Sequence, residues 1–105
     1  MGNRDLAASF REGNFHYRLP LTPGRYTVEL TFVEPKAAAG TRRFSVLANG
    51  RAALSNFDVA EAAGGALIEI RRRFDVSAGP DGLDLHFQPV SGNAIVSAVE
   101  VTPRS

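Results

Sequence analysis

The sequence contains no cysteine and no tryptophan, and its charges nearly cancel, with 12 Lys and Arg against 11 Asp and Glu. The absence of cysteine excludes disulfides, thiolate metal sites and cysteine nucleophiles together. The balanced charge argues against nucleic acid as a partner, because nucleic-acid-binding domains usually carry a clear basic excess. Nowhere do about 18 apolar residues follow one another, so we expect no membrane-spanning helix and no membrane partner. The N-terminus also lacks the apolar core of a signal peptide.

The composition that remains is typical of an ordinary globular chain. Hydrophobic residues make up 44% of the 105 residues and charged residues 22%, which distinguishes the chain from a disordered one. Domains cluster around roughly 100–150 residues, so we expect a single domain over residues 1–105 with a core of moderate size. No linker or internal repeat divides it.

Apolar and polar residues alternate with a period of two, which predicts strands. In residues 25–32 the aromatic and aliphatic side chains take the even positions, and Arg, Thr and Glu take the odd ones. This is the pattern of a half-buried strand. Residues 15–19 alternate in the same way. The turn signal Pro23-Gly24 between the two runs predicts that they form an antiparallel hairpin.

A second hairpin is predicted around Asn49-Gly50, a pair that favours the left-handed backbone of a type I′ turn. It would join residues 43–48 to residues 51–54. Residues 60–63 are rich in alanine and predict one helical turn, which the two glycines that follow would end quickly.

Three further alternating runs occupy residues 66–76, 83–87 and 95–101, separated by turns rich in Gly, Pro, Asp and Asn. The total is seven or eight short strands, with no long helical period and no βαβ unit. This predicts an all-β fold, an antiparallel β-sandwich. The predicted core consists of Tyr26, Val28, Leu30, Phe32, Phe44, Val46, Ile68, Ile70, Phe74, Leu83, Leu85, Phe87, Ile95, Val99 and Val101.

Histidine and aspartate give only weak signals for catalysis or metal binding. His16 and His86 lie on the polar faces of predicted strands, and no spacing supplies a third ligand, so we expect exposed strand histidines. Asp75, Asp81 and Asp84 surround a Gly-Pro-Asp-Gly turn, where aspartates commonly bond backbone N–H groups. We prefer this structural role to acid–base catalysis or a weak calcium site. We therefore expect no enzyme activity, no cofactor and no bound metal.

A run of three arginines at residues 71–73, together with the arginine pair at 42–43, resembles a basic patch. On a strand, however, the first and third arginines share a face with interleaved carboxylates. This favours cross-strand ion pairs on a solvated face over a nucleic-acid site. The middle arginine, Arg72, has the parity of the core, which predicts either a bulge or a pairing with a buried carboxylate.

The order and spacing of the strands resemble the malectin and malectin-like carbohydrate-binding domains over most of residues 10–102. The segments that carry the resemblance are GNFHYRLPL, GRYTVELTFVE, RFSV, NG, FDV, GLDLHF and AIVSAVEV. The resemblance implies a jelly-roll-like, galactose-binding-like sandwich that binds an oligosaccharide or glycan and often accompanies glycoside hydrolases. It also implies an extracellular or periplasmic location. By this resemblance, we expect a shortened domain without the family's N-terminal part and its glycine-rich opening strand.

Matched residue by residue, the family's sugar site is only partly kept. One stacking aromatic of that site falls on Phe10, which loses a hydroxyl group. A Tyr-Phe pair of the site falls on Lys36-Ala37, so both rings are absent. An aspartate near the last turn falls on Gly92, with Asn93 beside it.

The resemblance therefore implies a non-catalytic carbohydrate-binding domain with weak or altered specificity. Phe10 would stack on a pyranose ring, and Glu34, Lys36 and Asn93 would form hydrogen bonds with the hydroxyl groups of the sugar. Tyr17 is retained and is expected to pack structurally. The alternative is a structural or protein-interaction sandwich that has lost sugar binding and forms homo-oligomers through an exposed strand edge.

Overall fold

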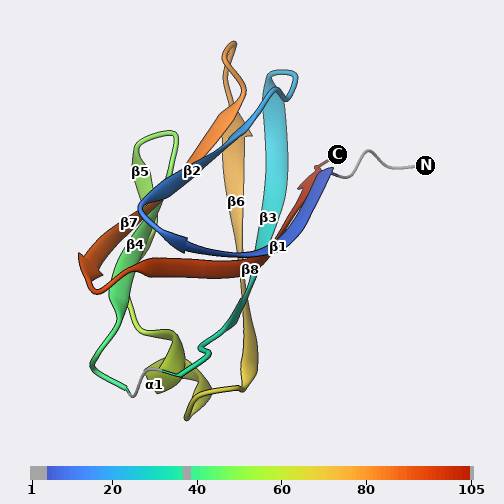
Figure 1. The fold of residues 1–105 in the computed structure, drawn as a ribbon. Coiled ribbons are helices and arrows are strands. Elements are labelled where there is room, and N and C mark those ends of the chain that lie inside the picture. Colours follow the sequence, from blue (N-terminus) through green and yellow to red (C-terminus); the bar gives the residue numbers. More distant parts are fainter. Residues whose placement is uncertain (1–4, 37–38, 105) are drawn as a thin grey trace.

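The computed structural model shows two antiparallel four-stranded sheets packed face to face (Figure 1). It describes residues 5–36 and 39–104, and for residues 5–10 the backbone alone. One sheet has the strand order β1-β8-β3-β6 and the other β2-β7-β4-β5, which confirms the all-β sandwich. The elements are β1 Asp5–Gly13, β2 Phe15–Leu19, β3 Gly24–Val33, β4 Arg43–Ala48, β5 Arg51–Phe57, α1 Val59–Ala63, β6 Glu69–Ala78, β7 Leu83–Ser91 and β8 Ala94–Pro103.

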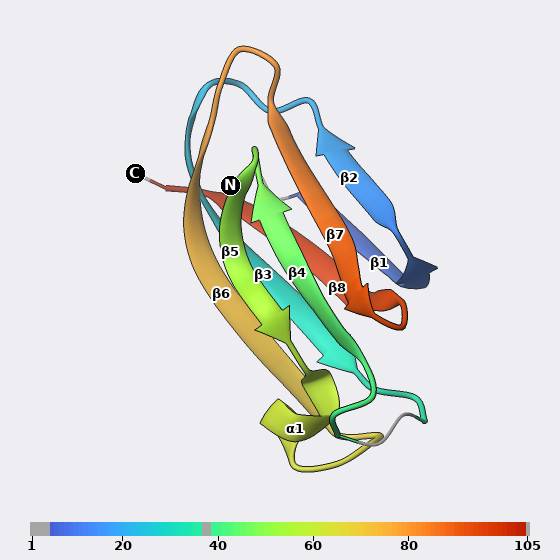
Figure 2. The ribbon, with the colours of Figure 1, turned by 90° about the vertical axis from the view of Figure 1, so that its left-hand side faces the viewer.

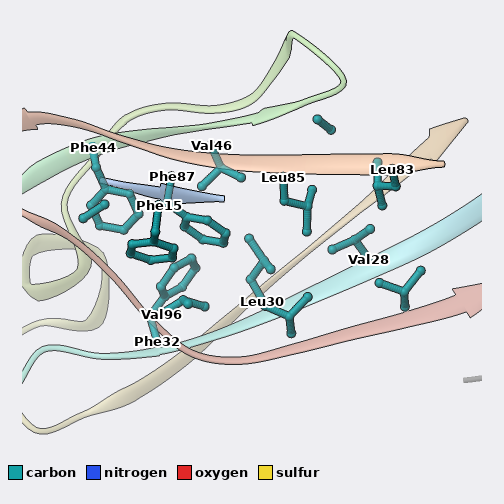
Figure 3. Packing of buried hydrophobic residues seen from close by; sticks show 14 of the residues in the cluster. Phe15, Val28, Leu30, Phe32, Phe44, Val46, Leu83, Leu85, Phe87 and Val96 are labelled. Atoms are coloured by element: carbon teal, nitrogen blue, oxygen red, sulfur yellow. The ribbon is translucent and has the colours of Figure 1, made fainter. Parts of the chain in front are cut away.

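The core lies between the sheets, where the inward side chains of β3 meet those of β4 and β7 (Figure 3). The rings of Phe32 and Phe44, from opposite sheets, lie 5.7 Å apart. The predicted core is confirmed outside residues 68–74. There Ile68 is 46% exposed, and Ile70 and Phe74 are only partly buried. The reason is that β6 is an edge strand with β3 as its one neighbour among the described strands, so its inward face is covered incompletely.

The predicted hairpin between residues 15–19 and 25–32 is wrong. β2 pairs with β7, whereas β3 pairs with β6 and β8, so these two consecutive strands lie in different sheets (Figure 2). The alternation pattern predicts no strand before residue 15, yet β1 pairs with β8, with a register shift between Ala8 and Arg11. Alternation identifies the buried face of a strand, but it does not select the strand's hydrogen-bonded neighbour.

The second predicted hairpin, β4 with β5, is confirmed. Asn49 and Gly50 have φ angles of 48° and 83°, as the left-handed turn requires. The predicted helical turn is α1, in which the Asp58 side chain accepts a hydrogen bond from the backbone of Glu61 at 3.0 Å. Gly64 ends the helix with φ 88°. In residues 5–36 and 39–104, no helix is long and apolar enough to cross a membrane.

Neither expectation for Arg72 is correct. β6 pairs with β3 in unbroken register, without a bulge. The guanidinium of Arg72 lies 5.4 Å from the centre of the Phe57 ring and donates to the backbone carbonyl of Arg71 at 2.9 Å. The expected ion pairs on the solvated face are confirmed, for example between Arg73 and Glu29 at 3.0 Å.

Candidate functional site

A buried ionic cluster lies at the end of the sandwich where β3 stops and β4 begins. Arg42 is 6% exposed and Glu34 is 0% exposed. Nε of Arg42 donates to Oε1 of Glu34 at 2.6 Å. Its Nη1 donates to Oε2 of Glu12 at 3.1 Å and to the backbone carbonyl of Asn93 at 2.8 Å. One guanidinium therefore joins β1, the segment after β3 and the turn between β7 and β8.

The charge of this guanidinium is secured by its neighbours. Burial by itself would lower the pKa of Arg42, but the hydrogen bonds and negative charges of Glu34 and Glu12 outweigh burial, so the pKa is raised above its ordinary value. A buried charge is tolerated when it is paired and hydrogen-bonded. The cluster therefore acts as a charged cross-link across this end of the fold.

Strand parity explains why both charged side chains are buried. The even positions of β3 point into the core from Tyr26 to Phe32, and Glu34 continues that parity one step beyond the strand. Arg42 has the parity of Phe44, the first buried residue of β4. This pair is not among the contacts predicted from the sequence. The continued parity of the two strands, read past their ends, is the signal that could have found it.

Three of the four residues predicted to contact sugar belong to this cluster or lie beside it, in different environments. Glu34 is fully buried, and its carboxylate also accepts a hydrogen bond from the backbone N–H of Lys36 at 3.3 Å. Lys36 and Asn93 are exposed at the surface. Phe10 lies in β1, and its side chain is outside the described side chains, as is all of Ala37. The structure thus brings three of the four predicted residues to one end of the sandwich.

Tyr17 packs in the sheet, as expected. Its ring meets those of Phe15 and Phe87 edge-on, each at 5.9 Å between centres. The Tyr17 hydroxyl is buried and has no hydrogen-bond partner among the described residues. The aromatic body of Tyr17 therefore contributes to the stability of the β2–β7 pair.

The two histidines are half-buried and stack on each other across β2 and β7, with ring centres 4.0 Å apart. Nδ1 of His16 lies 2.9 Å from the carboxylate of Asp84, and Nε2 of His86 lies 2.7 Å from the amide oxygen of Asn14. Partial burial, and then the proximity of His16, lower the pKa of His86. Within the described residues, no three His, Asp or Glu side chains gather to hold a metal ion.

Comparison with known proteins agrees with the fold and with the residues that carry the resemblance. The family model described as "Malectin domain" matches residues 7–102. Among solved structures, the chain is similar to β-glucuronidase from Bacteroides uniformis, with a TM-score of 0.83 and 18% identity, covering 91% of this chain and 11% of that one. No curated protein matches.

Two plant structures are also similar. The complex of the plant peptide RALF23 with FER and LLG2 matches with a TM-score of 0.76 and 20% identity, over 86% of this chain and 27% of that one. The ANX2 ectodomain from Arabidopsis thaliana matches with a TM-score of 0.71 and 16% identity, over 90% of this chain and 29% of that one. At these identities the likeness shows the fold alone. The chain spans less than a third of the length of each matched chain.

Proposed function

The chain belongs to the malectin family, and on this basis we propose that it is a non-catalytic carbohydrate-binding domain with weak or altered sugar specificity. A shared fold does not by itself carry a function. The observation that supports the proposal is the Arg42 cluster, which holds three chain segments together beneath an exposed polar surface. A sugar site needs such fixed segments, because hydroxyl groups are recognised by polar groups held in position.

The predicted residues take different roles in this proposal. Asn93 and Lys36 are exposed, and their side chains can donate hydrogen bonds to sugar hydroxyl groups. Phe10 supplies a ring on which the C–H face of a pyranose can stack. Glu34 is buried, so it acts as a positioning residue through Arg42 and does not touch the ligand.

Weak or altered specificity follows from what replaces the family's ring pair. Lys36 presents a flexible charged chain, and Ala37 has no group that can stack on a sugar. Binding energy at this position would come from hydrogen bonds that compete with water, each of which contributes only about 0.5–1.5 kcal/mol. We therefore expect low affinity.

Calorimetry with oligoglucosides and oligogalactosides tests the proposal. Phe10→Ala and Asn93→Ala should each weaken the binding of a sugar that gives heat, by about five-fold or more. The matched control is Arg18→Ala. Arg18 has 76% of its side chain exposed and is paired with Asp84 toward the other end of β2, so its loss should leave sugar binding unchanged. No heat with any of these sugars at millimolar concentration would contradict the proposal.

A further inference from the structure

A groove of about 480 Å³ lies between β5 and β6, away from the Arg42 cluster. These strands are the edges of the two sheets on the same side of the sandwich (Figure 2). Half-buried Phe74 and Val76 contribute apolar surface from β6. On the β5 side, Ala52 and Ala53 are small and leave the space between the strands open.

The edge of β6 that faces away from β3 has unpaired backbone groups between two carbonyl groups that accept side-chain hydrogen bonds. In an antiparallel strand, the N–H and C=O groups of alternate residues point to the same side. Two contacts identify that side: Arg72 donates to the carbonyl of Arg71 at 2.9 Å, and Asn49 donates to the carbonyl of Ser77 at 3.3 Å. The two odd-numbered residues between these carbonyls therefore direct their backbone groups away from β3. A further strand could pair with them.

The charges along the groove favour an acidic occupant. Arg25 and Arg51 line it and are exposed, and neither forms an ion pair within the described part of the chain. Asp75 is the acidic side chain in the lining. Its carboxylate is already engaged by Arg104 and by the hydroxyl of Thr27. The groove therefore carries two arginine charges that no ion pair in the described part of the chain neutralises.

We propose that this groove binds an extended peptide of alternating apolar and acidic residues, which adds as a strand to β6. Its backbone pairs with the outward groups of Arg73 and Asp75, as in other cases of strand addition. Side chains alternate across a strand, so the apolar ones lie on Phe74 and Val76. The acidic ones then lie on the outer face, within reach of Arg25.

Fluorescence anisotropy with a fluorescein-labelled, acetylated TVEVEVT amide tests the proposal. Two matched peptides serve as comparisons: TVKVKVT, and the acidic peptide with the backbone nitrogens of its two glutamates N-methylated, because these alternate residues would face Arg73 and Asp75. We expect both to bind at least ten-fold more weakly, because the lysine peptide has the wrong charge and the N-methylated peptide lacks two backbone N–H donors. Equal binding of the N-methylated peptide would mean that charge alone attracts it, and this would overturn strand addition.

Variants of the protein test the same contact from the other side. Arg73→Pro removes an outward N–H while leaving the pairing with β3 in place, so it should reduce peptide binding at least ten-fold. Arg73→Gln removes the same charge but keeps the backbone N–H, so it is the control for lost charge. Its affinity for the peptide should be closer to that of the native chain. Combining Arg25→Gln with Arg51→Gln should weaken binding about five-fold, as two exposed ion pairs would. Unchanged binding by this double variant would count against the proposal.

Two further measurements separate this proposal from its competitors. Sedimentation without peptide reports self-association; a dimer that the acidic peptide does not dissociate, and that Arg73→Pro abolishes, would make a second copy the occupant and overturn the proposal. Asn93→Ala should leave peptide binding intact, because the groove does not include Asn93. The sugar-binding proposal and the peptide-binding proposal can therefore be refuted separately, one by calorimetry with sugars and the other by anisotropy with the peptide. If Arg73→Pro unfolds the domain, the N-methylated peptide still decides the outcome.

Discussion

Replacing Arg42 by Met removes the buried positive charge at the end of the sandwich while keeping a side chain of comparable length. The carboxylate of Glu34, with 0% exposure, then loses the guanidinium 2.6 Å away. Removing one partner of a buried ion pair costs about 3–5 kcal/mol, because the other charge remains in a poorly solvating site. Domains of this kind have free energies of unfolding of about 5–15 kcal/mol. We therefore expect Arg42→Met to remove at least about a fifth of the free energy of unfolding, and most of it if the domain is only marginally stable.

Urea unfolding followed by far-UV circular dichroism measures this loss without relying on tryptophan, which the chain lacks. With a urea dependence of about 2 kcal/mol per molar, a loss of about 4 kcal/mol lowers the midpoint by about 2 M. The matched control is Arg73→Met, which breaks an ion pair to Glu29 in which the arginine is 69% exposed. Exposed pairs contribute at most about 1 kcal/mol, so this variant should change the midpoint by less than about 0.5 M.

A double variant decides whether the loss comes from the pair. Arg42→Met combined with Glu34→Leu removes both charges, and it should be more stable than the sum of the two single losses predicts, by about 1 kcal/mol or more. Strict additivity, or a loss below about 1 kcal/mol for Arg42→Met alone, would refute the reasoning.

Two other changes follow from local geometry. Gly82→Ala should cost more than about 2 kcal/mol in the same urea assay, because Gly82 has φ 84° and an added Cβ would lie 2.2 Å from the carbonyl oxygen of Leu19; a near-native midpoint would contradict this. The pKa of His86 is lowered in the folded chain, so His86 binds a proton more readily in the unfolded chain. The contribution of His86 to the free energy of unfolding should therefore be full above about pH 6.5 and should be lost as the pH falls below that value. His86→Gln should flatten that slope, and an unchanged slope would argue against His86 as its source.

Strand pairing was beyond the reach of the sequence pattern. Residues 15–19 and 25–32 were each recognisable as strands, because burial on one face imposes alternation. The turn signal Pro23-Gly24 between them predicted a hairpin, but β3 instead pairs over its length with β6, whose paired residues lie 36 to 54 positions later in the chain. Such pairing is decided by which strands together enclose the core, and this is a property of the whole chain.

The candidate site shows the same division. The resemblance implied that Glu34 bonds sugar hydroxyl groups, whereas the structure buries its side chain completely. Continued parity could have indicated that Glu34 and Arg42 both point inward, but no sequence pattern revealed that the cluster reaches Glu12 and the carbonyl of Asn93, because these contacts join β1, the segment between β3 and β4, and the β7–β8 turn. The side-by-side stacking of the two histidines likewise depends on the register of β2 with β7.

The sequence by itself determined the class of fold, the buried faces of most strands, the turn at Asn49-Gly50 and the family. These depend on alternation and on backbone preferences within a few neighbouring residues. Only the tertiary structure decided which strands pair, that Arg42 neutralises Glu34 inside the fold, and that β5 and β6 leave a groove between them. Such features depend on how segments from different parts of the chain pack together, and their free energy arises when the two sheets close over the core and exclude water.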